Sequence, residues 1–426
     1  MSVAAGQVPR RRSPIPVLVF GTGITALGVI RTLGRAGIPS YLISQDPGFS
    51  AYSRWYRGLP TGVTALPEPG NLAEWLETLP LDRAVLMPCA DDWVQAVAAL
   101  PASLSQRFPA SIASPEVIGA FLDKGRFAKL LQQQRLPHPR TVMLDSPEQL
   151  EGFSNGDFAG AFLKPRGSLE CCQRYGVKAF RVKDRAEAMR TLRDALNNGV
   201  TLMLQEYVPG PPTAHYFIDG FVDRNGRVCA RFARRRLRMH PPDFGNSSFH
   251  ASVPLKEVSG AMDTVDWLWT VLPYRGIFSA EFKYDARDGL FKILEVNVRP
   301  WWYIEFAARS GVDVCRLAYR DALGLPVDEV QEYKVGRRCV HPPFDVRAYR
   351  RLRREGQLGL WSWVRSWITA EQPVFCWGDP GPGMANLLLT VRGYWRDRKS
   401  PWLSKRLRSR RGAERDDITG APSRPQ

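Results

Sequence analysis

The 426-residue sequence predicts a mixed fold that begins as α/β and continues as α+β. Three observations predict this class. A strand, a tight glycine turn and a helix open the chain between residues 17 and 36, which is typical of a βαβ unit. Two β-rich runs joined by turn residues form a hairpin at residues 276–300. The last part of the chain is basic and holds six of the 13 tryptophans between residues 361 and 402.

The charge is concentrated at the two ends of the chain. Of the net charge of +17, residues 331–426 contribute +11 (20 Lys and Arg against 9 Asp and Glu) and residues 1–16 contribute +3, which leaves +3 for the 314 residues between. A nearly balanced centre argues against sequence-specific nucleic-acid binding, whereas basic ends favour a solvated tail or contact with a membrane or partner. The seven cysteines are scattered without a C-x-x-C pair, and no apolar secretory segment is visible, so we expect reduced thiols in a cytoplasmic protein.

The first unit follows an Arg- and Pro-containing segment, residues 1–16, that we expect to be disordered. A strand at 17–20, a helix at 24–36 and a strand at 40–44 then form the βαβ opening. Gly21, Gly23 and Ala26 fit the G-x-G-x-x-A dinucleotide fingerprint, so nicotinamide binding is one alternative. The same glycines serve any tight turn from a strand into a helix.

Acidic residues follow the next strand, at 84–87. Asp91 and Asp92 stand where the carboxyl ends of strands face a ligand crevice, so substrate contact is one interpretation. The alternative, which we favour for at least one of the two, is that they cap the helix expected at 93–100. A further helix is expected at 117–134, with Lys124 within it, followed by a strand at 141–144.

Two short strands are expected in the central region. Lys164 closes a short apolar strand at 161–165, where a compact ammonium suits a phosphate. The loop after it, 166–178, carries Arg166, Arg174 and Lys178 but few small residues. Glu206 and Val208 lie at the end of the strand 202–208, before a Pro-Gly turn.

Arginines crowd one strand of a hairpin at 215–239, which turns at Asn225-Gly226. Alternation places Arg234, Arg236 and Arg238 on one face and Arg235 on the other, with Arg231 earlier in the strand. We expect one or two of these five to bind a substrate carboxylate or a γ-phosphate. Residues 244–248 are polar and predict an irregular substrate loop.

The hairpin at 276–300 places acids inside apolar strands. Glu295 and Asn297 share a face because side chains alternate along a strand, and Glu281 reaches the same face if the strands pair. Two carboxylates and an amide oxygen, followed by Arg299, form a hard-oxygen site suited to Mg²⁺ and phosphate. The alternative is a solvated polar face.

An acid on one strand and E-x-N-x-R on its partner resemble the magnesium-binding end of the ATP-grasp superfamily, and the resemblance covers residues 17–325. It implies that Lys124 and Lys164 hold nucleotide phosphates, that Glu206 and Val208 contact the nucleotide, and that Glu281, Glu295 and Asn297 hold one or two Mg²⁺, or Mn²⁺. Arg299 is then the catalytic residue that stabilises the transferred phosphoryl group. The implied domains are a Rossmann-like domain at 17–114, the ATP-grasp domain at 115–325 and an extension at 326–402, with basic tails at 1–16 and 403–426.

The activity implied by the resemblance is an ADP-forming ligation of a small carboxylate to an amine through an acyl phosphate, in a protein that is often a homodimer in this superfamily. Two rivals remain at this point: a non-catalytic nucleotide-binding or membrane-recruited protein, and an NAD(P)-dependent oxidoreductase. Residues 350–368 predict one amphipathic helix, which lies either on an anionic membrane or partner, or on the enzyme's own surface.

Overall fold

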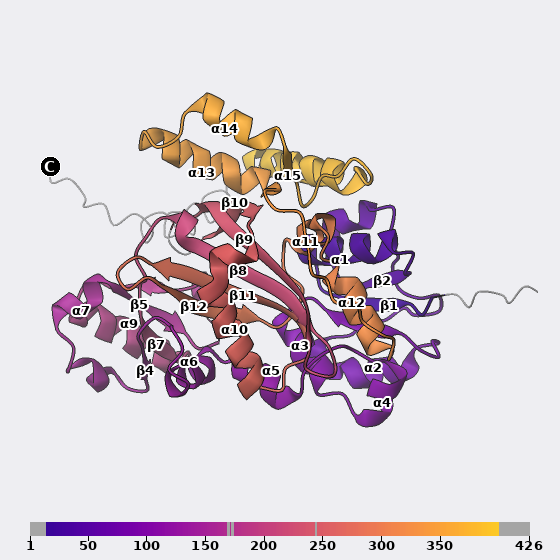
Figure 1. Ribbon diagram of the computed structural model, residues 1–426, viewed down its shortest axis with the longest axis horizontal. Helices are drawn as coiled ribbons and strands as arrows, with labels where there is room; N and C mark the ends of the chain where they lie inside the picture. Colours follow the sequence, from indigo (N-terminus) through magenta and orange to yellow (C-terminus); the bar gives the residue numbers. More distant parts are fainter. Residues whose placement is uncertain (1–13, 168–170, 172–173, 243–244, 400–426) are drawn as a thin grey trace, which may run out of the picture.

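The computed structural model describes residues 14–167, 171, 174–242 and 245–399. Figure 1 shows a small parallel sheet and a small antiparallel sheet at opposite ends, with a large sheet between them and a helical layer above it. Short 3-10 helices lie at Gly48–Tyr52 (η1), Pro69–Asn71 (η2), Pro147–Leu150 (η3), Pro212–Ala214 (η4) and Leu255–Val258 (η5).

The N-terminal sheet has three parallel strands in the order β2-β1-β3. Its elements are β1 (Val17–Phe20), α1 (Gly23–Arg35), β2 (Ser40–Ile43), α2 (Leu72–Thr78), β3 (Val85–Pro88), α3 (Asp91–Ala98) and α4 (Ala102–Arg107). Gly21 is required at the first turn because its φ is +142° and a Cβ there would lie 2.9 Å from the Cβ of Cys89. The turn therefore brings β1 and the end of β3 close together, as a βαβ opening predicts.

The second unit contains a four-stranded antiparallel sheet in the order β4-β7-β5-β6. Its elements are α5 (Pro115–Leu122), α6 (Lys124–Gln133), β4 (Thr141–Leu144), α7 (Asn155–Ala159), β5 (Ala161–Pro165), β6 (Phe180–Arg181), α9 (Arg185–Asn197) and β7 (Leu202–Glu206). The single helix expected at 117–134 is wrong, because it breaks at Asp123. The Asp123 carboxylate accepts hydrogen bonds from the backbone N–H groups of Gly125 (2.7 Å) and Arg126 (3.0 Å), and so starts α6 afresh.

The large sheet has seven strands in the order β12-β11-β8-β9-β10-β13-β14. Its strands are β8 (His215–Val222), β9 (Val228–His240), β10 (Asn246–Ser252), β11 (Gly276–Asp285), β12 (Leu290–Asn297), β13 (Arg338–Val340) and β14 (Ala370–Glu371), with helices α10 (Ser259–Val271), α11 (Ile304–Ser310) and α12 (Val314–Ala322). The two predicted hairpins, β8–β9 and β11–β12, are confirmed. The irregular loop expected at 244–248 is wrong from Asn246 onward, because β10 pairs with β9 and β13 there; Phe244 lies outside the described residues.

The helices after β13 form the layer above the sheet (Figure 1). They are α13 (Pro342–Arg354), α14 (Leu360–Trp367) and α15 (Gly381–Lys399). The single helix expected at 350–368 is wrong: α13 ends before Gly356, whose φ is +69°. The indole N–H groups of Trp363 and Trp367 both donate to Asp345 on α13, at 2.9 and 2.8 Å, and so fold α14 back onto α13. In the described part of the chain, no helix is both long and apolar enough to cross a membrane.

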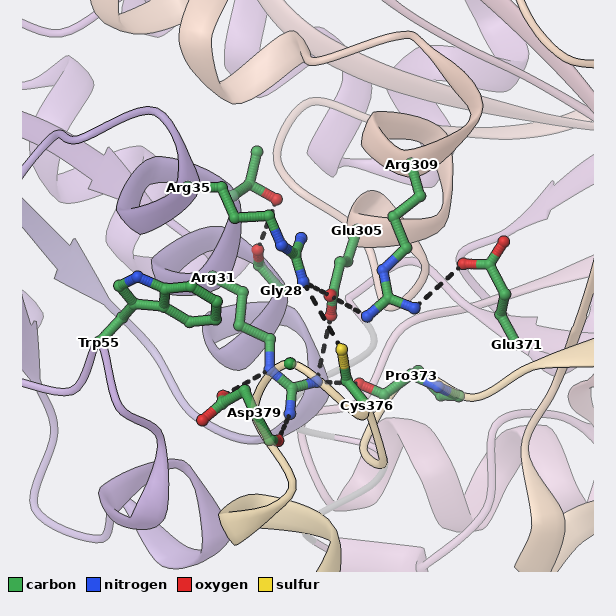
Figure 2. Close-up of polar contacts among 12 residues, drawn as sticks. Gly28, Arg31, Arg35, Trp55, Glu305, Arg309, Glu371, Pro373, Cys376 and Asp379 are labelled. Atoms are coloured by element: carbon green, nitrogen blue, oxygen red, sulfur yellow. Dashed lines mark hydrogen bonds and ion pairs between the residues drawn. The ribbon is translucent and has the colours of Figure 1, made fainter.

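A buried ion-pair network joins α1 to the segment that leads into α15 (Figure 2). Arg31 is fully buried and donates to Asp379 Oδ2 (2.9 Å), to Glu305 Oε2 (3.2 Å) and to the carbonyls of residues 373, 374 and 379. Arg35 and Arg309 also bond to Glu305, and Arg309 continues to Glu371 at 3.1 Å. The guanidinium of Arg31 thus links the N-terminal unit, α11 and the C-terminal segment through one side chain.

His341, the residue before α13, should make the fold sensitive to acid. Burial, assisted by the positive charge of Arg347, lowers the pKa of His341 to about 4, below its ordinary value of 6.5. Since the unfolded chain binds the proton more readily, stability is lost as pH falls from about 6.5 towards 4. We expect His341→Phe, which also removes a buried Nδ1 without a described partner, to lose less stability than the wild type between pH 7 and 4. The difference should reach about 3 kcal/mol in urea unfolding curves; parallel losses in both proteins would contradict it.

Candidate functional site

The acidic face of the β11–β12 hairpin forms as the strand pattern predicts. Glu281 pairs with Glu295, and Ser279 with Asn297, so these side chains project from the same face of the sheet. The amide of Asn297 lies 3.5 Å from Glu295 Oε1. Two carboxylates and an amide oxygen are donors that Mg²⁺ accepts, with phosphate and water oxygens completing the shell. Among the described residues, no group of three or more His, Cys, Asp and Glu side chains is placed to hold a metal ion.

Glu281 is held in the charged form by its neighbours. Its Oε1 accepts hydrogen bonds from Arg236 Nη2 (2.8 Å) and from His215 Nδ1 (3.1 Å). Burial opposes ionisation, but the positive charge of Arg236 and the bond from His215 hold the pKa of Glu281 well below its usual range. Both contacts fall on one oxygen, so the carboxylate is fixed in direction and charged at neutral pH, as a metal ligand must be.

Two lysines line a pocket between the four-stranded sheet and β12. Lys164 leaves β5 and donates to Gln205 Oε1 at 3.3 Å, and Lys124 is the first residue of α6. The same pocket is lined by apolar residues of α6, β7 and β12, among them Phe127, Met203 and Ile293. Burial lowers the pKa of Lys164, while Glu295 and Glu281 raise it and Lys124 lowers it further. Lys164 therefore interacts electrostatically with Lys124 and with both glutamates, although neither glutamate lines the pocket.

Glu206 is the last residue of β7, and Val208 lies two residues beyond it. Glu206 accepts a bond from the backbone N–H of Arg140 (3.1 Å) and pairs with Arg287 at 2.5 Å, while Val208 is 3% exposed. The carboxylate of Glu206 is therefore already paired, and a ligand that used it would have to share it with the Arg287 side chain, which is half exposed.

Arg299 contacts the N-terminal unit. Its Nε donates to Asp91 Oδ1 at 2.5 Å, so the first residue of α3 meets the residue that follows the E-x-N motif. Neither Asp91 nor Asp92 caps α3 from the N-cap position, because the helix begins at Asp91 and its N-cap is Ala90. The capping alternative is thus wrong, and Asp91 instead bridges two units of the fold.

Two of the five arginines of β9 reach the acidic face. Arg234 pairs with Asp219 at 2.7 Å, and Arg236 pairs with Glu281. The others have partners elsewhere: Arg238 binds Asp345 on α13, Arg231 binds Asp266, and Arg235 binds the carbonyl of Thr213. Alternation along β9 separates Arg234, Arg236 and Arg238 from Arg235 as expected, and all three are buried.

The basic residues of the loop 166–178 point to three different places. Arg166 pairs with Asp123 at 3.3 Å, Arg174 donates to the carbonyl of Asn198, and Lys178 donates to Asn246 Oδ1 at 3.1 Å. Residues 168–170 and 172–173, which include most of the unusual sequence of this loop, lie outside the described residues.

Solved structures with the same fold come from several enzymes. An L-amino acid ligase from Bacillus licheniformis superposes with a TM-score of 0.55 at 15% identity, over 77% of this chain and 79% of its own. The biotin carboxylase domain of Hydrogenobacter thermophilus 2-oxoglutarate carboxylase, in complex with ADP and magnesium, gives 0.58 at 16%, over 76% and 73%. N5-carboxyaminoimidazole ribonucleotide synthetase from Thermotoga maritima gives 0.53 at 13%, over 77% and 80%. This chain has the ATP-grasp fold.

The chain is also similar in sequence to a curated protein. D-aspartate ligase of Enterococcus faecium (strain Aus0004) is 22% identical over 247 residues, which is 56% of this chain. The match spans 58% of the length of that relative. No family model matches the chain.

Some residues of the candidate site could not be found from the local pattern of the sequence. His215 and Arg236, which bind Glu281, lie on neighbouring strands 66 and 45 residues away from it in the chain. Asp91 lies 208 residues from Arg299. The position of Asp91 at the end of a parallel strand was the one available signal, and it indicated the crevice without indicating the partner.

Proposed function

We propose that this protein is an ATP-dependent ligase that activates a small carboxylate as an acyl phosphate and couples it to an amine. One observation carries the proposal: Lys124 and Lys164 line one pocket, and the negative charges of Glu295 and Glu281, which pair on the neighbouring β11–β12 hairpin, act on Lys164. Two lysines close to a pair of carboxylates that can hold a divalent cation suit the phosphates and the metal ion of Mg-ATP.

The proposed roles follow from where each side chain lies. Lys124 and Lys164 bind the α- and β-phosphates, and Glu206 and Val208 contact the nucleoside. Glu281, Glu295 and Asn297 hold one or two Mg²⁺, or Mn²⁺ in its place, which neutralise charge on the β- and γ-phosphates. The unit formed by β1–β3 is inferred to be the Rossmann-like domain of the predicted architecture, on the basis of its parallel order and its glycine turn. The predicted domain boundaries and the homodimer stay predictions.

The reaction has two steps. A substrate carboxylate oxygen attacks the γ-phosphorus, and the bond to the β-phosphate oxygen breaks, which releases ADP. The amine nitrogen then attacks the acyl carbon, and inorganic phosphate leaves with the bonding electron pair. Arg299 stabilises the negative charge that develops on the transferred group and on the tetrahedral intermediate. The protein's part is to position reactants and neutralise charge, so no side-chain nucleophile is required.

Amino acids are the first substrates to test, since one relative is a D-aspartate ligase and one structural neighbour is an L-amino acid ligase. The experiment measures ADP and phosphate release from Mg-ATP against pooled amino acids of both configurations and small carboxylates. We expect release that requires both an acid and an amine, with the amide product seen by mass spectrometry. Absence of ATP binding would overturn the proposal. Binding without turnover on every pool would favour a non-catalytic nucleotide-binding protein.

A further inference from the structure

Helix α14 is apolar on two sides. Its inner side is fixed to the protein: Trp363 and Trp367 donate to Asp345, and Ser366 accepts a bond from Arg238. On its outer side, Trp361 is 78% exposed and Ile368, the residue after the helix, is 75% exposed. Leu360 and Val364 are exposed beside them, at the i, i+4 spacing that shares one face. The inner contacts make α14 a rigid platform for this outer side.

The segments that follow α14 add further exposed apolar side chains. Trp377, between β14 and α15, is 88% exposed. Along α15, Met384, Leu387, Leu388 and Leu389 are all exposed. In Figure 1 the three helices lie on one side of the molecule: α13 packs on β9 and β10 of the large sheet, and α15 packs on η1 of the N-terminal unit. A cluster of large apolar side chains in one outer layer is a feature of interaction surfaces.

The same layer is strongly basic. Within residues 342–368 the exposed charged side chains are six arginines and one acid: Arg347, Arg350, Arg351, Arg353, Arg354, Arg365 and Glu355. The other acid of this stretch, Asp345, is buried against Arg238. Residues 400–426, which follow α15, add seven Lys or Arg against three Asp or Glu.

We propose that the outer face of α13 and α14, with Trp377 and α15 beside it, docks this protein on an anionic lipid surface. Tryptophan prefers the boundary between headgroups and acyl chains, and arginine keeps its guanidinium at the headgroups while its stem covers apolar surface. Exposed Trp361 and Ile368 supply the insertion, and the arginines of α13 supply attraction to anionic headgroups. The pocket between the small antiparallel sheet and β12 is lined by other elements. Docking through this layer therefore holds the protein at the membrane without covering the pocket.

A second copy of this chain fits the face poorly. A two-fold interface would place the α13 arginines of one copy against the same surface of the other, with Glu355 the one exposed acid in residues 342–368 to offset them. An anionic lipid surface complements both the charge and the apolar side chains. An acidic protein partner would also match the charge. The test uses only purified protein and vesicles, so any binding that it detects is binding to lipid.

The test is co-sedimentation of the full-length protein with vesicles. The lipids are phosphatidylcholine alone, and phosphatidylcholine with phosphatidylglycerol in equal parts. We expect binding to the anionic vesicles, little binding to phosphatidylcholine, and weaker binding as salt is raised. The double variant W361S/I368S should lower the partition coefficient by about tenfold or more, because two large apolar side chains no longer leave water.

Trp267→Ser is the matched control, because Trp267 is also an exposed tryptophan (49%) but lies on α10, away from the layer. It should bind vesicles as the wild type does, and all three proteins should have equal thermal stability. Three outcomes would overturn the proposal. The first is that the protein does not bind anionic vesicles. The second is that W361S/I368S binds as strongly as the wild type, which would assign the binding to the basic tail. The third is that the wild type forms a dimer in solution and W361S/I368S does not. Vesicle binding is measured without ATP turnover, so the result tests the docking proposal separately from the proposed ligase activity.

Discussion

Glu295→Gln is expected to reduce ATP turnover by about 10²- to 10³-fold, the loss typical of removing one group that stabilises transition-state charge. Glu295 faces Glu281 across the β11–β12 ladder and acts electrostatically on Lys164 in the pocket. Glutamine keeps the shape of the side chain but removes the negative charge that a divalent cation needs. Phosphate release at saturating Mg-ATP, measured with the carboxylate and amine that the wild type uses, provides the readout.

The control is Glu257→Gln, the same substitution at a partly exposed glutamate that pairs with Arg235 outside the acidic face. It should keep wild-type turnover. A Mg²⁺ titration adds a second readout, since the Glu295 variant should require more of the ion for whatever turnover remains. Full activity in Glu295→Gln at ordinary Mg²⁺ would show that the acidic face does not hold the metal, and the proposed roles of Glu281 and Asn297 would fall with it.

Arg31→Met should destabilise the protein by about 3–5 kcal/mol, the cost of leaving buried charges without their partner. The substitution removes the donor to Asp379 and Glu305, both nearly inaccessible to water, and to three backbone carbonyls (Figure 2). Methionine fills much of the volume of the arginine stem, so the loss reports on the charge and its bonds. Urea unfolding followed by tryptophan fluorescence measures the free energy of unfolding.

Arg351→Met, on α13, tests the opposite case. Its pair with Glu355 is largely exposed, and exposed pairs contribute about 0–1 kcal/mol. The two variants remove the same charge by the same substitution, so the comparison isolates burial. If Arg31→Met unfolds at nearly the wild-type urea concentration, the network in Figure 2 does not hold the C-terminal segment to α1.

The sequence pattern predicted those site residues that lie together on a single strand or a single hairpin. Period-2 alternation placed Glu295 and Asn297 on one face, and the turn chemistry between β11 and β12 brought Glu281 opposite. Partners across the fold could not be predicted this way. The contacts of Arg299 with Asp91 and of Glu281 with Arg236 depend on which strands become neighbours, and alternation carries no information about that.

The errors in helix length have local causes that the sequence does contain. Asp123 is a good N-cap residue within an apolar-periodic stretch, and its side chain starts α6. Gly356 adopts a left-handed conformation and ends α13. In both stretches the apolar pattern continues across the capping residue, so periodicity predicts one helix where two form.

The pairing of β13 with β10 has a consequence for any shortened form of this protein. Without β13 and β14, the seven-residue strand β10 would be an edge strand of the large sheet, with a row of unpaired backbone N–H and C=O groups. Strands of other molecules could pair with these groups. In the intact chain the border strand is β14, only two residues long, with Glu371 in ion pairs to Arg309 and Arg337. Short, charged strands resist such pairing, so the C-terminal region protects the large sheet from aggregation, and a chain cut after α12 should precipitate.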